Sequence, residues 1–168
     1  AFQKAKEVEQ NIRQQQDLAK SNAEFQERQS RQTVLQNVVG QVQSQFQPQV
    51  ENLLGKFQLA PVPNEPKVSQ DFKQHVRDRI ASVVNEASVK SPALADVFKT
   101  LKLLGEPNGS RPEAIQAEIQ NYVSSFPYQT ALSRGLSELM QEVEKTVTAE
   151  AYRYKLLMMG YQQEVSKG

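Results

Sequence analysis

The chain has 168 residues, a net charge of +1, one histidine and no cysteine, and its mean hydropathy is −0.62. The lack of cysteine excludes disulfides, thiolate zinc sites and thiol catalysis, and the balanced charge gives no general attraction to nucleic acid or anionic membranes. No run of 18 apolar residues occurs, so we predict no transmembrane segment. The low hydropathy indicates that much of the chain is solvated, or is buried only in an assembly.

The first 60 residues hold 15 of the 23 glutamines. Glutamine is uncharged and favours helices. We therefore predict a long helix in this region that stays soluble and can still bind a partner protein. Residue 1 is Ala rather than Met, and no signal-peptide pattern follows it. We therefore expect a processed product or a piece of a longer protein.

Two stretches of this predicted helix differ in their apolar content. Over 1–33 the apolar residues are sparse, and a helix with so thin a stripe is marginal alone, so we expect it to depend on a neighbouring chain. From residue 34 a stronger stripe recurs about every 3.67 residues, the period of an 11-residue repeat. The thin stripe is Phe2, Ala5, Val8, Ile12, Leu18, Ala19 and Phe25, and the strong one is Leu35, Val38, Val42, Phe46, Val50, Leu53 and Phe57.

A strand is the rival prediction for 41–50, where glutamine occupies every odd position. The helical flanks and Pro48 decide for a helix, since proline is poorly tolerated inside a paired strand. Proline also removes one helical hydrogen bond and clashes with the preceding turn. We therefore predict a kink or a short break near Phe46–Pro48.

The proline-rich segment 61–66 marks the main predicted boundary, because no helix runs through it. We predict a helical extension over 1–60, a linker over 61–66 and a helical domain over 67–168, which we expect to fold alone.

Four helices are predicted in that domain. The first carries its apolar face over 72–87, with Ser69 as its predicted N-cap. Ser91 caps the second, which is stopped by Gly105; its inward residues are Leu94, Val97, Phe98, Leu101 and Leu104.

A capping box of Ser110 and Glu113 opens the third helix, which ends at Phe126–Pro127. The fourth runs over about 128–159, and Gly160 is its predicted stop. The predicted fold is all-α: a long N-terminal helix kinked near Pro48, a proline-rich connector and a bundle of about four helices.

The residues offer little catalytic or ligand chemistry. His75 has no triad or metal partner in its surroundings and is predicted to be exposed and without a role. Glu138 and Glu142 lack the Glu-x-x-His pattern of di-metal helices. The loop 105–110 lacks the phosphate-loop lysine, and the glycosylation sequon at Asn108 is expected by chance. We predict no enzyme, no metal and no cofactor.

The C-terminal helix gives the best pointer to a partner. Tyr152 to Lys155 interleave aromatic and basic residues, yet packing explains them better than nucleic-acid stacking, so no specific nucleic acid is predicted. The run 156–159 is apolar on nearly every side, which predicts burial in the domain or against a second chain. The predicted partner interface is Leu35, Val38, Val42, Phe46, Val50, Leu156, Met158 and Met159.

These observations favour a non-enzymatic structural or interaction subunit of a multi-copy assembly, whose partners are other protein chains in a homo-oligomer or a multi-subunit complex. The composition resembles that of tailed-phage internal (ejection) proteins, which are often Gln- and Ala-rich, helical and poor in cysteine. That resemblance implies a soluble virion component; no other compartment follows from the residues. The alternative is an amphipathic helical protein that binds a lipid or membrane surface.

Overall fold

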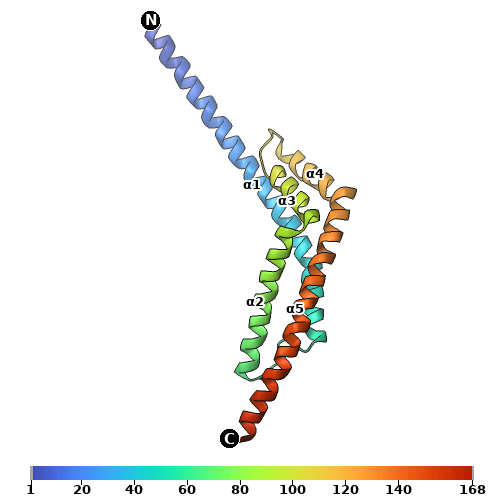
Figure 1. The fold of residues 1–168 in the computed structure, drawn as a ribbon. Coiled ribbons are helices and arrows are strands. Elements are labelled where there is room, and N and C mark those ends of the chain that lie inside the picture. Colours follow the sequence, from blue (N-terminus) through green and yellow to red (C-terminus); the bar gives the residue numbers. More distant parts are fainter. Residues whose placement is uncertain (1, 168) are drawn as a thin grey trace. The chain divides into compact units, whose positions relative to one another are not determined.

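A computed structural model describes residues 2–167, which form five α-helices and no strand (Figure 1). The prediction of an all-α fold with a long N-terminal helix and a helical bundle is confirmed. The helices are α1 (Phe2–Lys56), α2 (Lys67–Lys90), α3 (Pro92–Leu104), α4 (Pro112–Val123) and α5 (Phe126–Lys167).

Helix α1 runs through Pro48 as one element of 55 residues, so the predicted short break is wrong. Pro48 itself is exposed, while Val50 lies in the apolar core and Phe46 packs against that core. These contacts on either side hold the helix together although proline removes a hydrogen bond. The predicted kink at this position stays a prediction.

The predicted helix starts are partly confirmed. Ser91 is the one residue between α2 and α3, and its Oγ accepts a 3.3 Å hydrogen bond from the Leu94 N–H, as an N-cap does. Ser69 does not cap α2, because the helix begins at Lys67 after Pro66 and Ser69 is buried inside its first turn.

The predicted capping box at Ser110 is also wrong, since α4 begins at Pro112 with Arg111 as its N-cap residue. The Ser110 side chain is instead bonded to Asn108 and Glu118. Phe98, expected to face inward, is 51% exposed.

The last helix is longer than predicted at both ends. It begins at Phe126, where the preceding helix was predicted to end, and Phe126 is 81% exposed. It also continues past Gly160 to Lys167. A glycine inside a helix costs only about 1 kcal/mol, so good helix formers on both sides carry the helix through it.

The chain forms two compact units whose ranges differ from those of the predicted domains, and the predicted division at 61–66 stays a prediction. Unit 1 is Ala1–Gly40 with Lys99–Ser125, and unit 2 is Gln41–Phe98 with Phe126–Gly168. The loop over 57–66 does contain the proline-rich segment. Because α1 contributes to both units, the predicted extension is part of each of them.

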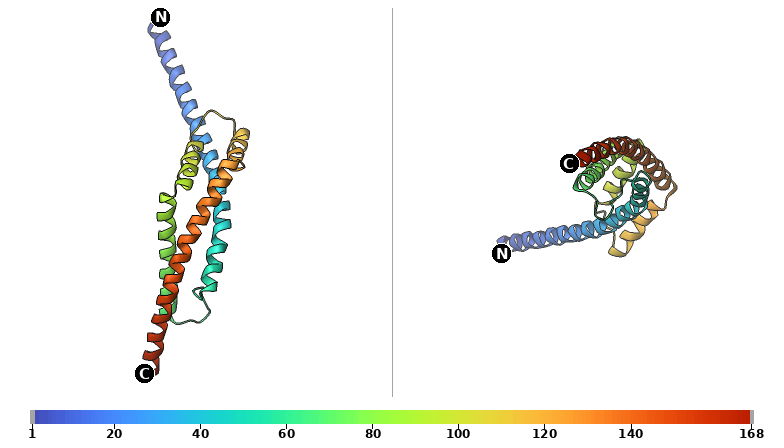
Figure 2. Two further views of the ribbon diagram at one scale, coloured as in Figure 1. Left: turned by 45° about the vertical axis from the view of Figure 1, so that its right-hand side comes forward. Right: turned by 90° about the horizontal axis from the view of Figure 1, so that it is seen from below.

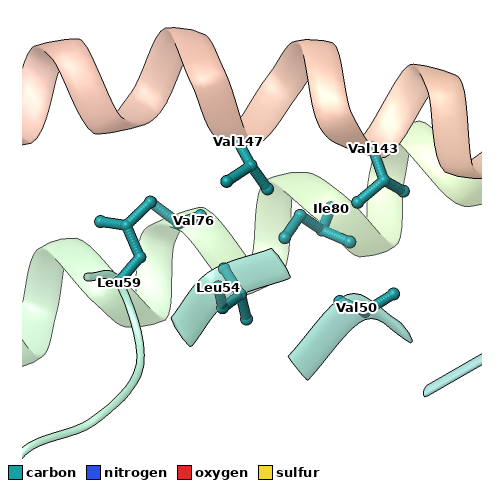
Figure 3. Close-up of a cluster of buried hydrophobic side chains, with 7 residues drawn as sticks. All are labelled: Val50, Leu54, Leu59, Val76, Ile80, Val143 and Val147. Carbon is teal, nitrogen blue, oxygen red and sulfur yellow. The ribbon is translucent and has the colours of Figure 1, made fainter. Parts of the chain in front are cut away.

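The core of unit 2 joins three helices. Helices α2 and α5 lie side by side (Figure 2) with their backbones close together, and the second half of α1 packs on them through its side chains. Figure 3 shows the buried cluster, which consists of Val50, Leu54, Leu59, Val76, Ile80, Val143 and Val147. Three of these residues precede the proline-rich segment, so a fragment of 67–168 would lose part of its own core.

Candidate interaction surfaces

Arg31 lies at the centre of a polar network in unit 1. Its side chain is completely buried, and its Nε donates to Glu27 Oε2 at 2.8 Å. Its Nη1 donates to the Leu104 carbonyl at 2.9 Å, and its Nη2 donates to Asn108 Oδ1 at 2.7 Å and to Glu118 Oε2 at 2.9 Å. One guanidinium therefore ties α1 to the end of α3, to the following loop and to α4. We call Glu27, Arg31, Asn108 and Glu118 the Arg31 network.

The loop after α3 is shaped to meet this network. The backbone N–H groups of Asn108 and Gly109 donate to the two Glu27 carboxylate oxygens, at 2.7 and 3.0 Å. Gly109 has φ +83°, a conformation that favours glycine. The Asn108 side-chain amide also donates to Glu118 at 2.9 Å. A glycan on Asn108 would break these bonds, so the structure uses the sequon as a structural loop.

The charges of the network stabilise one another. The hydrogen bond from Arg31 lowers the pKa of Glu27 and of Glu118. Burial alone would lower the pKa of Arg31, but its bonds to the two carboxylates outweigh this and raise it. All three groups are thus held in their charged forms, and the network has the properties of a structural clamp.

Glu150 forms a second buried charge site, in unit 2. It is 1% exposed, and its Oε1 lies 2.8 Å from Arg153 Nη1 and 3.4 Å from Arg79 Nε. His75, with 58% of its side chain exposed, approaches Glu150 Oε2 at 4.0 Å. Within the described chain that oxygen accepts no hydrogen bond. The single histidine is therefore exposed as predicted, but it lies beside a carboxylate that the sequence did not indicate.

The residues described by the structure contain no group of three or more His, Asp or Glu side chains placed to hold a metal ion. None of the five helices combines the length and the apolar character needed to cross a membrane.

The predicted interface residues fall into two groups. On α1, Val38 and Val50 are only 6% and 4% exposed, so each is covered mainly by the chain itself. Leu35, Val42 and Phe46 are half-buried.

On α5, Leu156 is 53% and Met159 58% exposed, so the predicted burial of both is not provided by the chain itself. Met158 is half-buried, and its Sδ accepts a 3.3 Å hydrogen bond from Ser69 Oγ at the start of α2. The tip is therefore divided between an inner side that packs on α2 and an outer side that is open.

The open side of α5 is an apolar stripe at helical spacing. Tyr152, Leu156 and Met159 are 67%, 53% and 58% exposed and recur at steps of four and three residues, which places them on one face. We call these three residues the outer stripe. Arg153 and Lys155 flank it on its two sides by helical geometry.

The start of α1 forms a second uncovered surface, which we call the N-terminal arm (residues 2–19). Each of its side chains is exposed, including Phe2 at 76%, Val8 at 56% and Ile12 at 47%. Among the residues that the structure describes, the arm makes no hydrogen bond or ion pair to another helix; its Arg13–Glu9 pair is internal, at 3.1 Å. At 1.5 Å per residue the arm is about 27 Å long.

A groove with a cavity of about 500 Å³ lies between α1 and α2 in unit 2. Its floor is apolar and its rim carries mainly side-chain amides. The lining residues are Gln43, Phe46, Gln47, Val50, Leu54, Arg77, Ile80, Ala81, Val84 and Asn85.

The Arg31 network was missed by sequence reasoning, although a signal for it exists. Glu27 and Arg31 are four residues apart and in phase with Ile12, Ala19 and the buried Val38. A charged pair in the phase of an apolar stripe indicates buried charge, but the partner carboxylate, Glu118, lies far along the chain.

The comparisons with known proteins found no match: no protein-family model, no curated protein and no solved structure is significantly similar to this chain.

Proposed function

We propose that this protein is a non-enzymatic helical subunit of a multi-copy assembly and that it binds other protein chains through apolar helix faces. The observation that carries the proposal is the outer stripe, where Leu156 and Met159 are more than half exposed on a helix whose opposite side packs on α2. Apolar side chains clustered on one exposed face are typical of interaction sites.

The N-terminal arm supports the same proposal. A helix this thinly apolar gains little from its own packing and is marginal in isolation. Its apolar residues Phe2, Val8 and Ile12 are 76%, 56% and 47% exposed, so they gain little from burial within the described chain. A partner that covers them would supply the missing burial.

The virion interior is the most specific setting we propose, on the resemblance of composition to tailed-phage ejection proteins. A cysteine-free chain with 23 glutamines and uncovered helix faces is suited to packing in many copies. Mass spectrometry of purified virions from cells that encode the chain should detect it in several copies per particle. Its absence from the particles would overturn this setting.

Sedimentation velocity tests the assembly proposal directly. The full chain should sediment above the monomer mass at micromolar concentration, and Leu156→Glu with Met159→Glu should return it towards the monomer, because unpaired charges are costly to desolvate. A matched variant, Gln162→Glu with Ser166→Glu, adds the same charge to exposed residues of the same helical end. We expect it to keep the assembly.

A chain that stays monomeric at every concentration would contradict self-assembly. If the Leu156→Glu, Met159→Glu variant assembles like the parent, the outer stripe is not part of the interface. Circular dichroism of both variants checks that the helices are intact.

Binding to a lipid surface is the second candidate, favoured by Arg153 and Lys155 beside the outer stripe. Such basic residues flank the apolar face of interfacial helices. Co-sedimentation with vesicles of mixed neutral and anionic phospholipid separates the two functions. Binding that is lost in the Leu156→Glu, Met159→Glu variant would support the lipid function, and no binding by the parent would exclude it.

A further inference from the structure

One exposed face of α1 has the residue spacing of a coiled-coil helix. Seven of its residues recur at alternating steps of three and four, as the a and d positions of a heptad do. All seven are exposed, none is charged, and all lie within unit 1. Its apolar members, Val8, Leu18 and Phe25, are each more than half exposed. We call the seven residues the heptad seam: Val8, Asn11, Gln15, Leu18, Asn22, Phe25 and Gln29.

The heptad seam faces away from the packed side of α1. Glu27 of the buried Arg31 network lies two residues from both Phe25 and Gln29, and two residues correspond to about 200° around a helix. By the same spacing, most charged residues of this stretch lie on that far side: Glu9, Arg13, Asp17, Lys20 and Glu24. The chain therefore keeps charge off one face of α1 and leaves that face exposed.

Two charges of opposite sign lie beside the two ends of the heptad seam. Glu7 directly precedes Val8 and Arg28 directly precedes Gln29, so both charges are on the same flank. Arg28 is 3.5 Å from Glu106, but both side chains are more than half exposed, so Arg28 can still pair with a partner. The opposite flank is uncharged: Ala5, Ile12, Ala19 and Gln26. A fitting helix needs a basic residue beside Glu7 and an acidic one beside Arg28.

A second copy of the heptad seam, in antiparallel orientation, supplies this pattern. In the register that places Val8 level with Phe25 of the second copy, the two ends of the seam form apolar layers. The amides of Asn11 and Asn22 meet across the interface, where each can both donate and accept a hydrogen bond. The layers, each present twice, are Val8 with Phe25, Asn11 with Asn22 and Gln15 with Leu18.

The same register pairs the flanking charges. Glu7 of each copy lies beside Arg28 of the other copy, which gives two ion pairs related by a two-fold axis. On the opposite flank Ile12 lies beside Ala19 of the second copy and extends the apolar contact. Because both ion pairs and both apolar end layers form at once, the interface closes as a dimer.

A parallel pair of the same helices fits less well. In register it places like residues together, so Lys4, at the seam position before Val8, faces Lys4 of the second copy. Glu7 and Arg28 then lie beside uncharged residues. In the antiparallel pair, Lys4 lies beside the amide of Gln29 instead. The charges therefore favour the antiparallel orientation.

We propose that the heptad seams of two copies pair as an antiparallel two-stranded coiled coil. This inference rests on the proposed function and names a second copy of this chain as the partner at the N-terminal part of α1. The seam has few apolar layers, so this pairing is weak and forms at higher concentrations than the contact through the outer stripe.

Cysteine trapping on the full chain tests the orientation. The protein has no cysteine, so Asn11→Cys and Asn22→Cys each introduce a unique thiol. The two preparations, one of them carrying a mass label, are mixed under mild oxidation. The antiparallel pair should give the mixed disulfide, because bridged Cα atoms lie within about 7 Å of each other. Disulfides between like positions should be absent, since these positions are then about 16 Å apart along the helix axis.

Charge reversal supplies a second measurement, made in the doubly substituted outer-stripe variant so that the outer stripe does not contribute. Glu7→Lys or Arg28→Glu alone should raise the dimer dissociation constant about three- to tenfold, because each places like charges together twice. The two substitutions together should restore it, since the pairs form again with reversed signs. Asp17→Lys and Lys20→Glu make the same charge changes on the far side of α1 and should leave it unchanged.

Phe25→Gln tests the apolar layers. It removes one partner from both end layers and should raise the dimer dissociation constant by roughly thirtyfold. The matched control is Phe2→Gln, which makes the same change outside the heptad seam and should have little effect. All the substituted positions of α1 are exposed, so the helical content should stay that of the parent.

The outcomes separate the two proposals. The mixed disulfide, together with rescue by the double charge reversal, supports the antiparallel pair. Disulfides only between like positions would show parallel pairing and overturn the inference, and equal amounts of all three disulfides would show random collision and overturn it too. If no disulfide forms while assembly still depends on the outer stripe, the inference is overturned and the proposed function stands. A parent chain that is monomeric at every concentration would overturn both.

Discussion

The most prominent buried group differs in chemistry between the two units of the molecule. In unit 1 the largest buried side chain is Arg31, held by two carboxylates, an amide and a backbone carbonyl. In unit 2 the buried cluster consists of Val, Leu and Ile side chains from α1, α2 and α5. Buried ions gain their stability from complete pairing, whereas aliphatic side chains gain it from each atom removed from water. Unit 1 should therefore be the more sensitive to loss of one group and to pH.

Arg31→Met should have the largest effect. It leaves Glu27 and Glu118 in partly buried positions without their cation, and breaking a buried pair costs about 3–5 kcal/mol. Thermal unfolding should show the loss, and hydrogen exchange should locate it at α4. Arg28→Met, which removes only a solvent-exposed 3.5 Å pair with Glu106, should change little.

A triple variant sharpens this comparison. Adding Glu27→Gln and Glu118→Gln to Arg31→Met removes the unpaired charges and should recover much of the lost stability. No recovery would mean that Arg31 acts through packing and backbone contact more than through charge.

Leu54→Ala should have the next largest effect, about 3 kcal/mol, because Leu54 is 1% exposed and its truncation leaves a cavity. Faster hydrogen exchange should appear in α2 and α5 rather than in α4. The control is Leu103→Ala, at a leucine that is 64% exposed. An equal increase of the hydrogen-exchange rate in α4 and in α2 would show that the two units are not energetically distinct.

Gly135→Ala should destabilise unit 2 by about 1–3 kcal/mol. A Cβ at this buried position would overlap the Leu94 side chain, and overpacking has costs of this size. Gly160→Ala, in the same helix with open space around it, should instead stabilise the protein by up to about 1 kcal/mol through helix propensity. The two melting temperatures should move in opposite directions; a shift in the same direction would contradict the close packing at Gly135.

Acid should destabilise unit 1 before unit 2, and this effect should be smaller than those of the substitutions at Arg31, Leu54 and Gly135. The folded pKa values of Glu27 and Glu118 are depressed, so their stabilising effect is complete above the unfolded value of about 4.3 and is lost as the pH falls through the folded values. Between neutral pH and about pH 3, exchange-derived stability should fall more in α4 than at Val143 and Val147 in α5. Glu118→Gln should flatten this difference.

The sequence predicts the elements of this fold better than the contacts between them. Helical periodicity and Ser91 located the boundary between α2 and α3, because both signals are local. The helix boundaries predicted from Ser110 and Gly160 were wrong. The side chain of Ser110 bonds to Asn108 and Glu118 instead of capping α4. A single glycine costs too little helix stability to end a long helix such as α5.

The candidate sites show the same limit. The exposed Leu156 and Met159 belong to an apolar run that is visible in the sequence. The groove depends on how far α1 stands from α2, a distance that no local pattern contains. Val38 and Val50 were assigned to a partner interface, although the chain itself buries them. An apolar stripe indicates that a helix face is buried, but it does not indicate which helix or chain covers that face.

Helix α1 changes from exposed to buried along its length, and this change limits where a protease can cleave the chain. Its first basic residues, from Lys4 to Arg28, are exposed on a helix that opens easily, whereas the Arg31 side chain is enclosed. Brief digestion with trypsin should therefore shorten the protein stepwise from its N-terminus and stop after Arg28. The resistant fragment would begin just before Arg31, and occupation of the arm by a partner would protect the earlier sites as well.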